Sequence, residues 1–386
     1  MFRTPLFHPF IMLISRKKIL KLVVVSATTI LLIEILLRLA CPLLPVTTAN
    51  GLGNKYKVTF QGIYNWDMNN KMTRMKSNFR TRMFYNGYRW NHSTDSRGFR
   101  NQVSTGKTDV LLLGDSMIYG HGVDAESTIS HHLEKISGIR VYNMGQQGAC
   151  MHEEYTFASE YIDELSPSHI ILFFLNNDLS DLAKKLIPTE MRKFVSSPDT
   201  DFATTYIDKA QAAVHKYTTL YKFTKDIYCL RAIQVISKAI KERRQHGRRE
   251  TAGPAIASTL PIVRVSHSNR AQPQIPKTVN DNRLPMEFTR KGLTKLHLRC
   301  KNAGIHFTFA YIHTGQPGDD EYERELATHC KSNDISYINL KTILAGSPTF
   351  FLENDGHFSD AGANAVAGHL AEKLGIPTPF ANQQQE

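Results

Sequence analysis

Short runs of apolar residues alternate with stretches of helical spacing along much of the chain. The runs at 110–113 and 170–175 have the length and the aliphatic or aromatic character of strands buried on both faces of a parallel sheet. Predicted helices separate them, an order typical of right-handed crossovers. The expected strands are 110–113, 139–142, 170–175, 305–311 and 335–340, and the expected helices are 127–136, 151–165, 289–302, 321–331 and 360–374. The pattern therefore predicts an α/β domain with a central parallel sheet.

Two segments depart from this alternation. Residues 46–105 are rich in Asn, Arg, Tyr and Met, and we interpret them as a lead-in that supplies an edge strand and a loop packed on the domain. Residues 183–285 contain an amphipathic helical pattern at 217–244, which would cover the sheet or dock on a partner, and then a basic, aperiodic stretch at 245–283 that favours a mobile loop.

The pattern divides the chain into six parts. The predicted divisions are a basic N-terminus at 1–18, a membrane span at 19–40, the lead-in at 46–105, the first part of the core at 106–182, the insertion at 183–285 and the second part of the core at 286–378.

Residues 19–40 carry the pattern of a membrane span. They are mainly Leu, Ile and Val, and as a helix they would extend roughly 33 Å, enough to cross a hydrocarbon core. Lys21 and Arg38 can reach the two membrane surfaces, and Glu34 can pair with Arg38. Basic residues before the span predict a cytoplasmic N-terminus and an extracytoplasmic remainder. A cleaved signal peptide is the alternative, but the segment has no small-x-small cleavage site, so we expect an uncleaved signal anchor.

The end of the first predicted strand carries the most informative polar residues. The sequence DVLLLGDSMIYGHG occupies 109–122, and Asp115 and Ser116 directly follow the hydrophobic run. Open parallel sheets bind their ligands at this edge, which makes the serine a candidate nucleophile. Taken alone, these two residues could instead cap the following helix.

Four blocks of the sequence resemble the SGNH (GDSL-type) hydrolase family, and they follow the family's order. They are GDSMIYGHGVDAESTISHHLEK at 114–135, NMGQQG at 143–148, NND at 176–178 and NDGH at 354–357. DSRGFR at 95–100 is also similar to the lead-in of membrane-anchored members. The resemblance covers about residues 95–183 and 286–375. It implies a three-layer α/β/α fold with a central parallel sheet of the SGNH/flavodoxin-like kind.

The resemblance also implies a role for each matching residue. Ser116 would be the nucleophile, His357 the base and Asp355 the acid of a catalytic triad. The backbone N–H groups of Ser116 and Gly148 and the side chain of Asn177 would form the oxyanion hole. A serine hydroxyl needs an adjacent imidazole, oriented by a carboxylate, before it can attack an ester, and fixed donors stabilise the negative charge that develops. This chemistry implies no metal and no organic cofactor.

Two positions depart from the family's pattern. The acid more commonly lies three residues before the histidine, where this chain has Asn354, whereas Asp355 lies two residues before it. Asp355 remains our candidate, and the identity of the acid stays open. Asn176 stands where glycine is usual, which could narrow the pocket. For Gly145, Asp178 and Asp181 we expect structural roles in turns and caps; they are not assigned to catalysis.

Composition limits the other functional classes. The formal net charge is +12, but much of the excess lies at 16–21 and 241–249 and no nucleic-acid-binding motif accompanies it, so we expect no nucleic-acid partner. No Walker A, GxGxxG or zinc-protease motif is present. Four of the five cysteines, Cys150, Cys229, Cys300 and Cys330, lie well beyond the span, and both a bridge between Cys300 and Cys330 and four free thiols stay open.

The sequence thus predicts a membrane-anchored serine esterase whose catalytic domain lies outside the cytoplasm. Tyr85, Tyr88 and Trp90 could stack on sugar rings, which favours an acylated carbohydrate of the cell envelope, although packing is the alternative role of these aromatics. The absence of a long apolar stretch beside the motifs points to a short acyl group such as acetyl. Two alternatives are a polysaccharide O-acetyltransferase with the same triad and a non-catalytic envelope-binding or assembly protein on the same fold.

Overall fold

The chain forms two compact units. The first unit is Met1–Gly53 with Phe223–Ala255, and the second is Asn54–Lys222 with Ile256–Glu386. The computed structural model describes residues 16–40, 43, 63–67, 72–85, 88–101, 108–197, 229, 232–233, 236, 282–316, 318–353 and 355–375.

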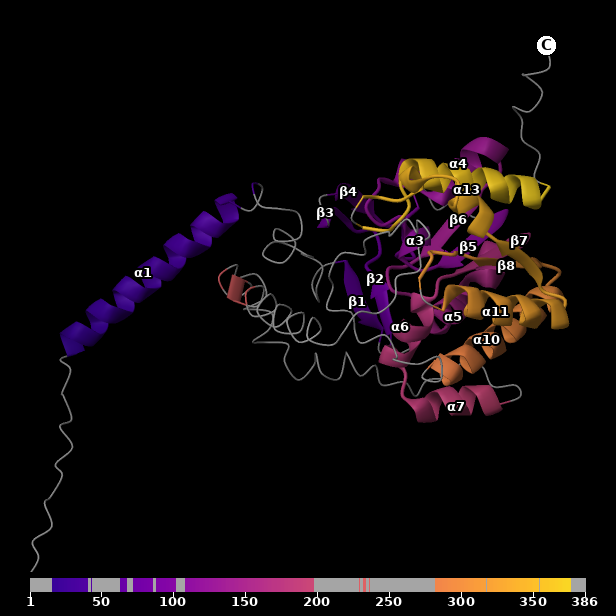
Figure 1. The fold of residues 1–386 in the computed structure, drawn as a ribbon, viewed down its shortest axis with the longest axis horizontal. Helices are drawn as coiled ribbons and strands as arrows, with labels where there is room; N and C mark the ends of the chain where they lie inside the picture. The colour runs from indigo at the N-terminus through magenta and orange to yellow at the C-terminus, as the bar shows by residue number, and fades with distance from the viewer. Residues whose placement is uncertain are drawn as a thin grey trace, which may run out of the picture. The chain divides into compact units, whose positions relative to one another are not determined.

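The first unit contains one long apolar helix, α1 (Arg16–Ala40) (Figure 1). By length and composition it could cross a membrane, a property that N-terminal signal sequences share. Its polar groups are satisfied locally, because Thr28 and Thr29 donate to carbonyl oxygens one turn earlier and Arg38 Nε donates to Glu34 Oε1 at 2.8 Å. The predicted N-terminal apolar helix is therefore confirmed, and its orientation stays a prediction.

Most of the predicted insertion lies outside the described residues. Of the helix predicted at 217–244, the structure describes residues 229, 232–233 and 236, which are helical. The loop predicted at 245–283 lies outside the description up to residue 281. Helix α10 (Arg283–Asn302) begins six residues before the predicted start at 289.

A five-stranded parallel sheet forms the centre of the second unit. Its strands are β5 (Val110–Gly114), β6 (Val141–Gly145), β7 (His169–Phe174), β8 (His306–Tyr311) and β9 (Ser336–Asn339), in the order β6-β5-β7-β8-β9. The chain therefore places its first core strand between the next two, and helices start at the carboxyl ends of β5 and β7. This is the switch point at which open α/β sheets bind ligands.

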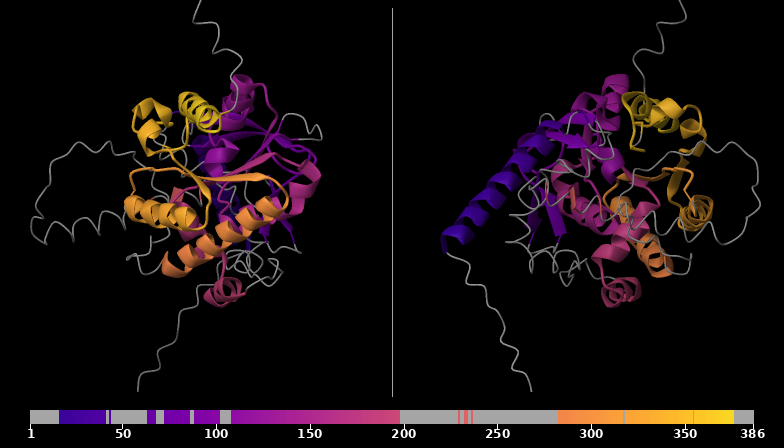
Figure 2. Two further views of the ribbon diagram at one scale, coloured as in Figure 1. Left: turned by 90° about the vertical axis from the view of Figure 1, so that its right-hand side faces the viewer. Right: turned by 60° about the vertical axis from the view of Figure 1, so that its left-hand side comes forward.

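Helices cover both faces of the sheet (Figures 1 and 2). On one face Leu111 and Leu113 join the buried cluster of α5 (Met151–Leu165), α10 and α11 (Asp319–Ser332). On the other, Val110 and Leu112 join the cluster of α4 (Ile129–Ser137) and α13 (Asp360–Lys373). Because successive strand residues alternate in direction, one apolar run contributes to both cores. The predicted three-layer α/β/α fold is confirmed.

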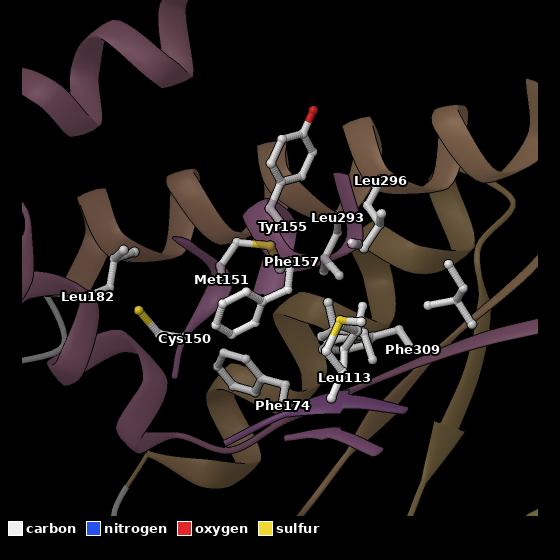
Figure 3. Packing of buried hydrophobic residues seen from close by; sticks show 14 of the residues in the cluster. Leu113, Cys150, Met151, Tyr155, Phe157, Phe174, Leu182, Leu293, Leu296 and Phe309 are labelled. Atoms are coloured by element: carbon white, nitrogen blue, oxygen red, sulfur yellow. The ribbon is translucent and has the colours of Figure 1, made fainter. Parts of the chain in front are cut away.

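The layer of α5 and α10 is closely packed. Figure 3 shows Met151 and Phe157 of α5 between the helix α10 and the sheet residues Leu113 and Phe174. Gly292 of α10 permits this approach, since a Cβ there would lie 2.5 Å from Met151 Cγ. Each large apolar side chain buried in this way contributes about 1.5–3 kcal/mol.

The lead-in forms two separate antiparallel pairs. Strand β1 (Tyr64–Asp67) pairs with β2 (Met72–Met75), and β3 (Arg80–Tyr85) pairs with β4 (Tyr88–Ser93). The expectation of an edge strand is wrong for the described residues, because none of these four strands pairs with the central sheet. The expected packing on the domain is confirmed by apolar side chains buried in the same cluster as Leu111. They are Ile63, Met72, Met75, Met83, Tyr85, Trp90 and Phe99.

The motif at 95–100 attaches the lead-in to the core. Asp95 Oδ1 accepts from the backbone N–H groups of Arg97 (2.9 Å) and Phe99 (3.0 Å). Gly98 has φ +87° and approaches the Met75 carbonyl so closely that a Cβ would lie 2.4 Å from it. The buried guanidinium of Arg100 donates to four backbone carbonyl oxygens, which belong to Asn91, Tyr119, Gly120 and Val123. Arg100 thereby fixes the chain that follows the candidate nucleophile.

The remaining short helices are α3 (Ser116–Tyr119), α6 (Asn177–Lys185), α7 (Pro188–Ser196) and α12 (Lys341–Leu344), with 3₁₀ turns at Ala125–Ser127 and Pro348–Phe350. The cysteines Cys150, Cys229, Cys300 and Cys330 are free thiols. Of the two alternatives for Cys300 and Cys330, the structure therefore has the unbridged one.

Candidate active site

The candidate nucleophile lies where β5 ends and α3 begins. Asp115 Oδ1 accepts from the backbone N–H of Met117 at 2.9 Å, so Asp115 provides the cap and leaves the Ser116 hydroxyl available. Gly145 at the end of β6 is required for this turn, since a Cβ there would lie 2.3 Å from the backbone nitrogen of Tyr119. Gly145 thus has a structural role, as expected, because it allows α3 to pack closely against the end of β6.

The last sequence block lies beside Ser116. His357 Nε2 is 2.8 Å from Ser116 Oγ, and His357 Nδ1 makes a short hydrogen bond with Asp355 Oδ1. The Asp355 side chain is 1% exposed, whereas that of His357 is 22% exposed. An ionised carboxylate only accepts hydrogen bonds, so it holds the proton on Nδ1 and leaves the Nε2 lone pair toward the serine hydroxyl. This arrangement can withdraw the serine proton.

A closed loop carries the histidine and the acid. The Leu352 N–H donates to the His357 carbonyl at 2.7 Å, and Gly356, with φ +84°, completes the turn between the two functional residues. Tyr88 of β4 donates its hydroxyl to the carbonyl of Glu353 at 3.0 Å, so the lead-in contacts this loop directly. The alternative acid, Asn354, lies outside the described residues.

The three predicted oxyanion donors come from three different elements. Gly148, with φ +71°, follows β6 and is tied into a turn by a bond from the Ala149 N–H to the Gln146 carbonyl. Among the described residues, no partner occupies the backbone N–H of Ser116 or Gly148. Asn177 opens α6, and its Nδ2 is 3.3 Å from Asp115 Oδ2, as is Ser116 Oγ. The Asn177 amide therefore lies near the nucleophile.

Buried carboxyl groups lie behind these donors. Burial raises the pKa of Asp115, Glu154 and Asp178, and the negative charge of neighbouring carboxylates, Asp115 among them, raises it further for Glu154 and Asp178. Both Glu154 carboxyl oxygens are buried without a hydrogen-bond partner in the described part of the chain. These three carboxyl groups therefore keep their protons to a higher pH than exposed carboxyl groups do. Asp178 accepts from the Leu175 N–H at 3.0 Å, which agrees with its expected structural role.

A second imidazole, which the sequence did not indicate, stacks on the candidate base. The rings of His121 and His357 lie 4.2 Å apart with an interplanar angle of 27°. Gln147 Nε2 lies 2.7 Å from His121 Nδ1, and its Oε1 accepts from the Tyr64 hydroxyl. His121 lies between two glycines with positive φ, Gly120 and Gly122. This GHG sequence was the only feature of the chain that could have indicated His121 as a site residue.

The aromatic lead-in residues surround His121. The ring of Tyr85 lies 5.1 Å from it and that of Trp90 lies 4.8 Å from it, and these side chains are only 5% and 1% exposed. The proposed stacking of Tyr85 and Trp90 on sugar rings is therefore wrong, and their packing role is confirmed. Tyr88 is only partly buried, and its stacking on a sugar stays a prediction.

His121, Asp355 and His357 could together face a metal ion, because one ligand atom of each lies within 4.8 Å of the others. Asp355 and His357 are, however, already hydrogen-bonded to one another. A metal ion there would replace the proton between them and remove the base. The donor set therefore fits a hydrogen-bonded acid–base pair better than a resident metal.

In sequence comparisons, no family model and no curated protein matches the chain. Three similar solved structures are a GDSL-like lipase from Bacteroides thetaiotaomicron, an esterase from Pseudoalteromonas sp. and an acetylxylan esterase from Geobacillus stearothermophilus. Each of the three is 10% identical in sequence to this chain, and their TM-scores are 0.35, 0.37 and 0.36 in the order given. The matches cover 69%, 70% and 71% of this chain and 88%, 97% and 98% of those chains.

The solved structures that this chain resembles are GDSL-type lipases and esterases. Identities this low concern the fold alone, and TM-scores below 0.5 add no weight to a choice of function. The assignment of an activity therefore depends on the geometry of Ser116, His357 and Asp355.

Proposed function

We propose that this protein is a serine esterase that hydrolyses short-chain acyl esters, with O-acetyl groups of a cell-envelope or exported carbohydrate as its substrate. One observation carries the proposal: His357 Nε2 lies 2.8 Å from Ser116 Oγ while Nδ1 of the same ring bonds to the buried Asp355. This is the geometry that a serine hydroxyl needs to become a nucleophile at neutral pH.

Acylation follows from this geometry. His357 takes the hydroxyl proton of Ser116 as Oγ attacks the ester carbonyl, and Asp355 stabilises the resulting imidazolium. The carbonyl electrons move to oxygen, toward the N–H groups of Ser116 and Gly148 and the amide of Asn177. When the intermediate collapses, the bond to the alcohol breaks and His357 returns the proton to it. An acyl-serine and a free alcohol result.

Deacylation repeats these steps with water. His357 removes a proton from water as its oxygen attacks the acyl-serine, and the second tetrahedral intermediate releases the carboxylic acid while Ser116 Oγ regains a proton. If a sugar hydroxyl replaces water, the same groups perform acetyl transfer. The alternative of an O-acetyltransferase therefore differs only in the acceptor.

The residues exposed on the second unit favour the proposal that the substrate is polar and carries a short acyl group. In its described part, Leu298 on α10 is the one large apolar residue with a mostly exposed side chain, so the described residues offer no wide apolar surface beside the triad. A long acyl chain would need such a surface to be removed from water. The groups around the triad are instead polar, including Gln147, Asn177 and Asp181.

An acceptor experiment distinguishes hydrolysis from transfer. We expect the full chain in detergent to release acetate from an activated acetyl ester at the same rate with and without an added oligosaccharide. Acetate and acetylated sugar are both quantified by mass spectrometry. Acetylated sugar formed at the expense of free acetate would contradict the esterase proposal and establish the transferase.

We further propose that α1 is an uncleaved signal anchor and that the second unit lies outside the cytoplasm. The proposal is supported by the basic residues Lys17, Lys18 and Lys21 at the start of the apolar helix. A C-terminal alkaline phosphatase fusion should be active and should remain in carbonate-washed membranes. Activity of a cytoplasmic reporter at this position, or release by carbonate, would contradict the orientation or the anchor respectively.

A further inference from the structure

One lysine connects parts of the proposed oxyanion hole that lie on different elements. Lys185 is the last residue of α6, the helix that begins with Asn177. Its Nζ donates to the carbonyl oxygen of Gly148 and, at 2.7 Å, to Glu153 Oε1. The Lys185 side chain is 21% exposed and that of Glu153 is 2% exposed. The pair therefore lies in a largely desolvated place directly behind the Gly148 turn.

Both members of this pair are charged at neutral pH. Burial lowers the pKa of Lys185, but Cys150, Glu153 and Asp181 together raise it above its ordinary value. Burial raises the pKa of Glu153, and the charge of Lys185 outweighs this and lowers it. A hydrogen bond from a charged donor is shorter and stronger than one between neutral groups. Lys185 therefore holds the Gly148 carbonyl more firmly than a neutral side chain would.

Besides the turn closed by the Ala149 N–H and the Gln146 carbonyl, Gly148 is held by its bond from Lys185. Its φ of +71° lies in the left-handed region, and a Cβ at this position would meet no atom within 4 Å. A glycine has no side chain that could pack and fix its backbone, and it is conformationally freer than other residues. The other two donors are already connected, since Ser116 Oγ and Asn177 Nδ2 both contact Asp115 Oδ2. Lys185 extends this connection, through α6, to Gly148.

We propose that Lys185 is a positioning residue that holds the Gly148 amide in register with the Ser116 and Asn177 donors. The inference rests on the proposed esterase function. Oxyanion donors act on charge that exists only in the tetrahedral intermediate and its transition states. Loss of the lysine should therefore lower kcat and leave KM nearly unchanged, which a general loss of packing would not do.

The experiment compares two variants that differ only at Lys185. Glu153→Gln can still accept from the Cys150 N–H with its single amide oxygen, and it avoids leaving a buried carboxylate unpaired when the lysine is removed. Adding Lys185→Met to this background should lower kcat for an aryl acetate by about 10- to 100-fold, with KM within about twofold. Affinity for a phosphonate that mimics the tetrahedral intermediate should fall in parallel.

A neighbouring ion pair supplies the matched control. Lys193 and Glu190 on α7 are 3.0 Å apart, and Lys193→Met with Glu190→Gln should leave kcat unchanged. Near-UV circular dichroism verifies folding, and Lys185→Gln in the Glu153→Gln background replaces the methionine variant if that one unfolds. Unchanged kcat without Lys185, or an equal loss in the control pair, would overturn the inference while the esterase stands. Failure of the wild-type chain to hydrolyse the ester would overturn the proposed function and this inference together.

Discussion

Ser116→Ala should reduce hydrolysis of a short-chain aryl ester by at least about 10⁴-fold, because the variant lacks the atom that forms the acyl-enzyme. The Ser116 hydroxyl lies 2.8 Å from His357 Nε2 and 3.3 Å from Asp115 Oδ2, and its one hydrogen can be donated to either of them. Removing one oxygen there leaves the core intact, so the circular dichroism spectrum should not change. Initial rates of alcohol release measure the effect.

A serine on the opposite edge of the sheet is the matched control for Ser116. Ser168 precedes β7, and its hydroxyl donates to the Asp109 carbonyl at 2.8 Å, so Ser168→Ala should retain full activity. A fluorophosphonate should label the wild-type chain at Ser116 and leave Ser116→Ala unlabelled. Unaltered turnover in Ser116→Ala would exclude the mechanism. Absence of labelling in the folded wild-type chain would favour the non-catalytic binding protein.

Asp355→Asn should lower kcat by about 10³- to 10⁴-fold. The carboxylate fixes the proton on His357 Nδ1, whereas an amide can donate a hydrogen to that nitrogen and so move the imidazole proton to Nε2. The wrong tautomer presents a donor to the serine hydroxyl where a base is needed. Steady-state kinetics on an aryl acetate measure the loss.

Two further variants show whether the loss of kcat is specific to Asp355. Asp360 pairs with His132 at 3.0 Å on the surface, and Asp360→Asn should leave kcat unchanged because neither residue contacts Ser116. Asn354→Ala should also cost far less than Asp355→Asn. The reverse order would mean that the last sequence block is aligned one residue away from its proper position.

The sheet and the candidate triad could be predicted because local sequence specifies them. A run buried on both faces must end at a sheet edge, and Ser116 follows such a run directly. Asp355 and His357 are neighbours in sequence, so their contact needs only a turn. The contact between Ser116 and His357 spans 241 positions, and the family's fold, through the resemblance, brought these two residues together.

The other site residues could not be predicted, because their roles arise only between distant segments. His121 is informative only when stacked on His357, and no spacing in the sequence encodes that stack. Lys185 follows Lys184 at the end of a helix, where basic residues are common for electrostatic reasons alone. Its bond to Gly148 depends on how α6 packs beside the turn after β6.

Two of the aromatic residues of the lead-in, Tyr85 and Trp90, were misinterpreted for a related reason. A strand pattern shows which side chains share a face but leaves open whether that face meets water or protein. Tyr85 and Trp90 lie on the face of β3 and β4 that packs against His121, so they are buried. A strand pattern also leaves open which strand is the partner. The lead-in strands could therefore not be predicted to pair with one another instead of with the central sheet.

The attachment of the lead-in changes where the catalytic unit begins. Tyr64 contacts Gln147, Tyr88 contacts the loop of the candidate acid, and Arg100 holds the carbonyls after the nucleophile helix. A fragment cut just before β5, where the repeating α/β pattern starts, would lose all three supports although it kept every residue of the triad. A fragment that keeps the candidate active site intact must therefore begin between the end of α1 and Ile63, because the lead-in and the site belong to the same compact unit.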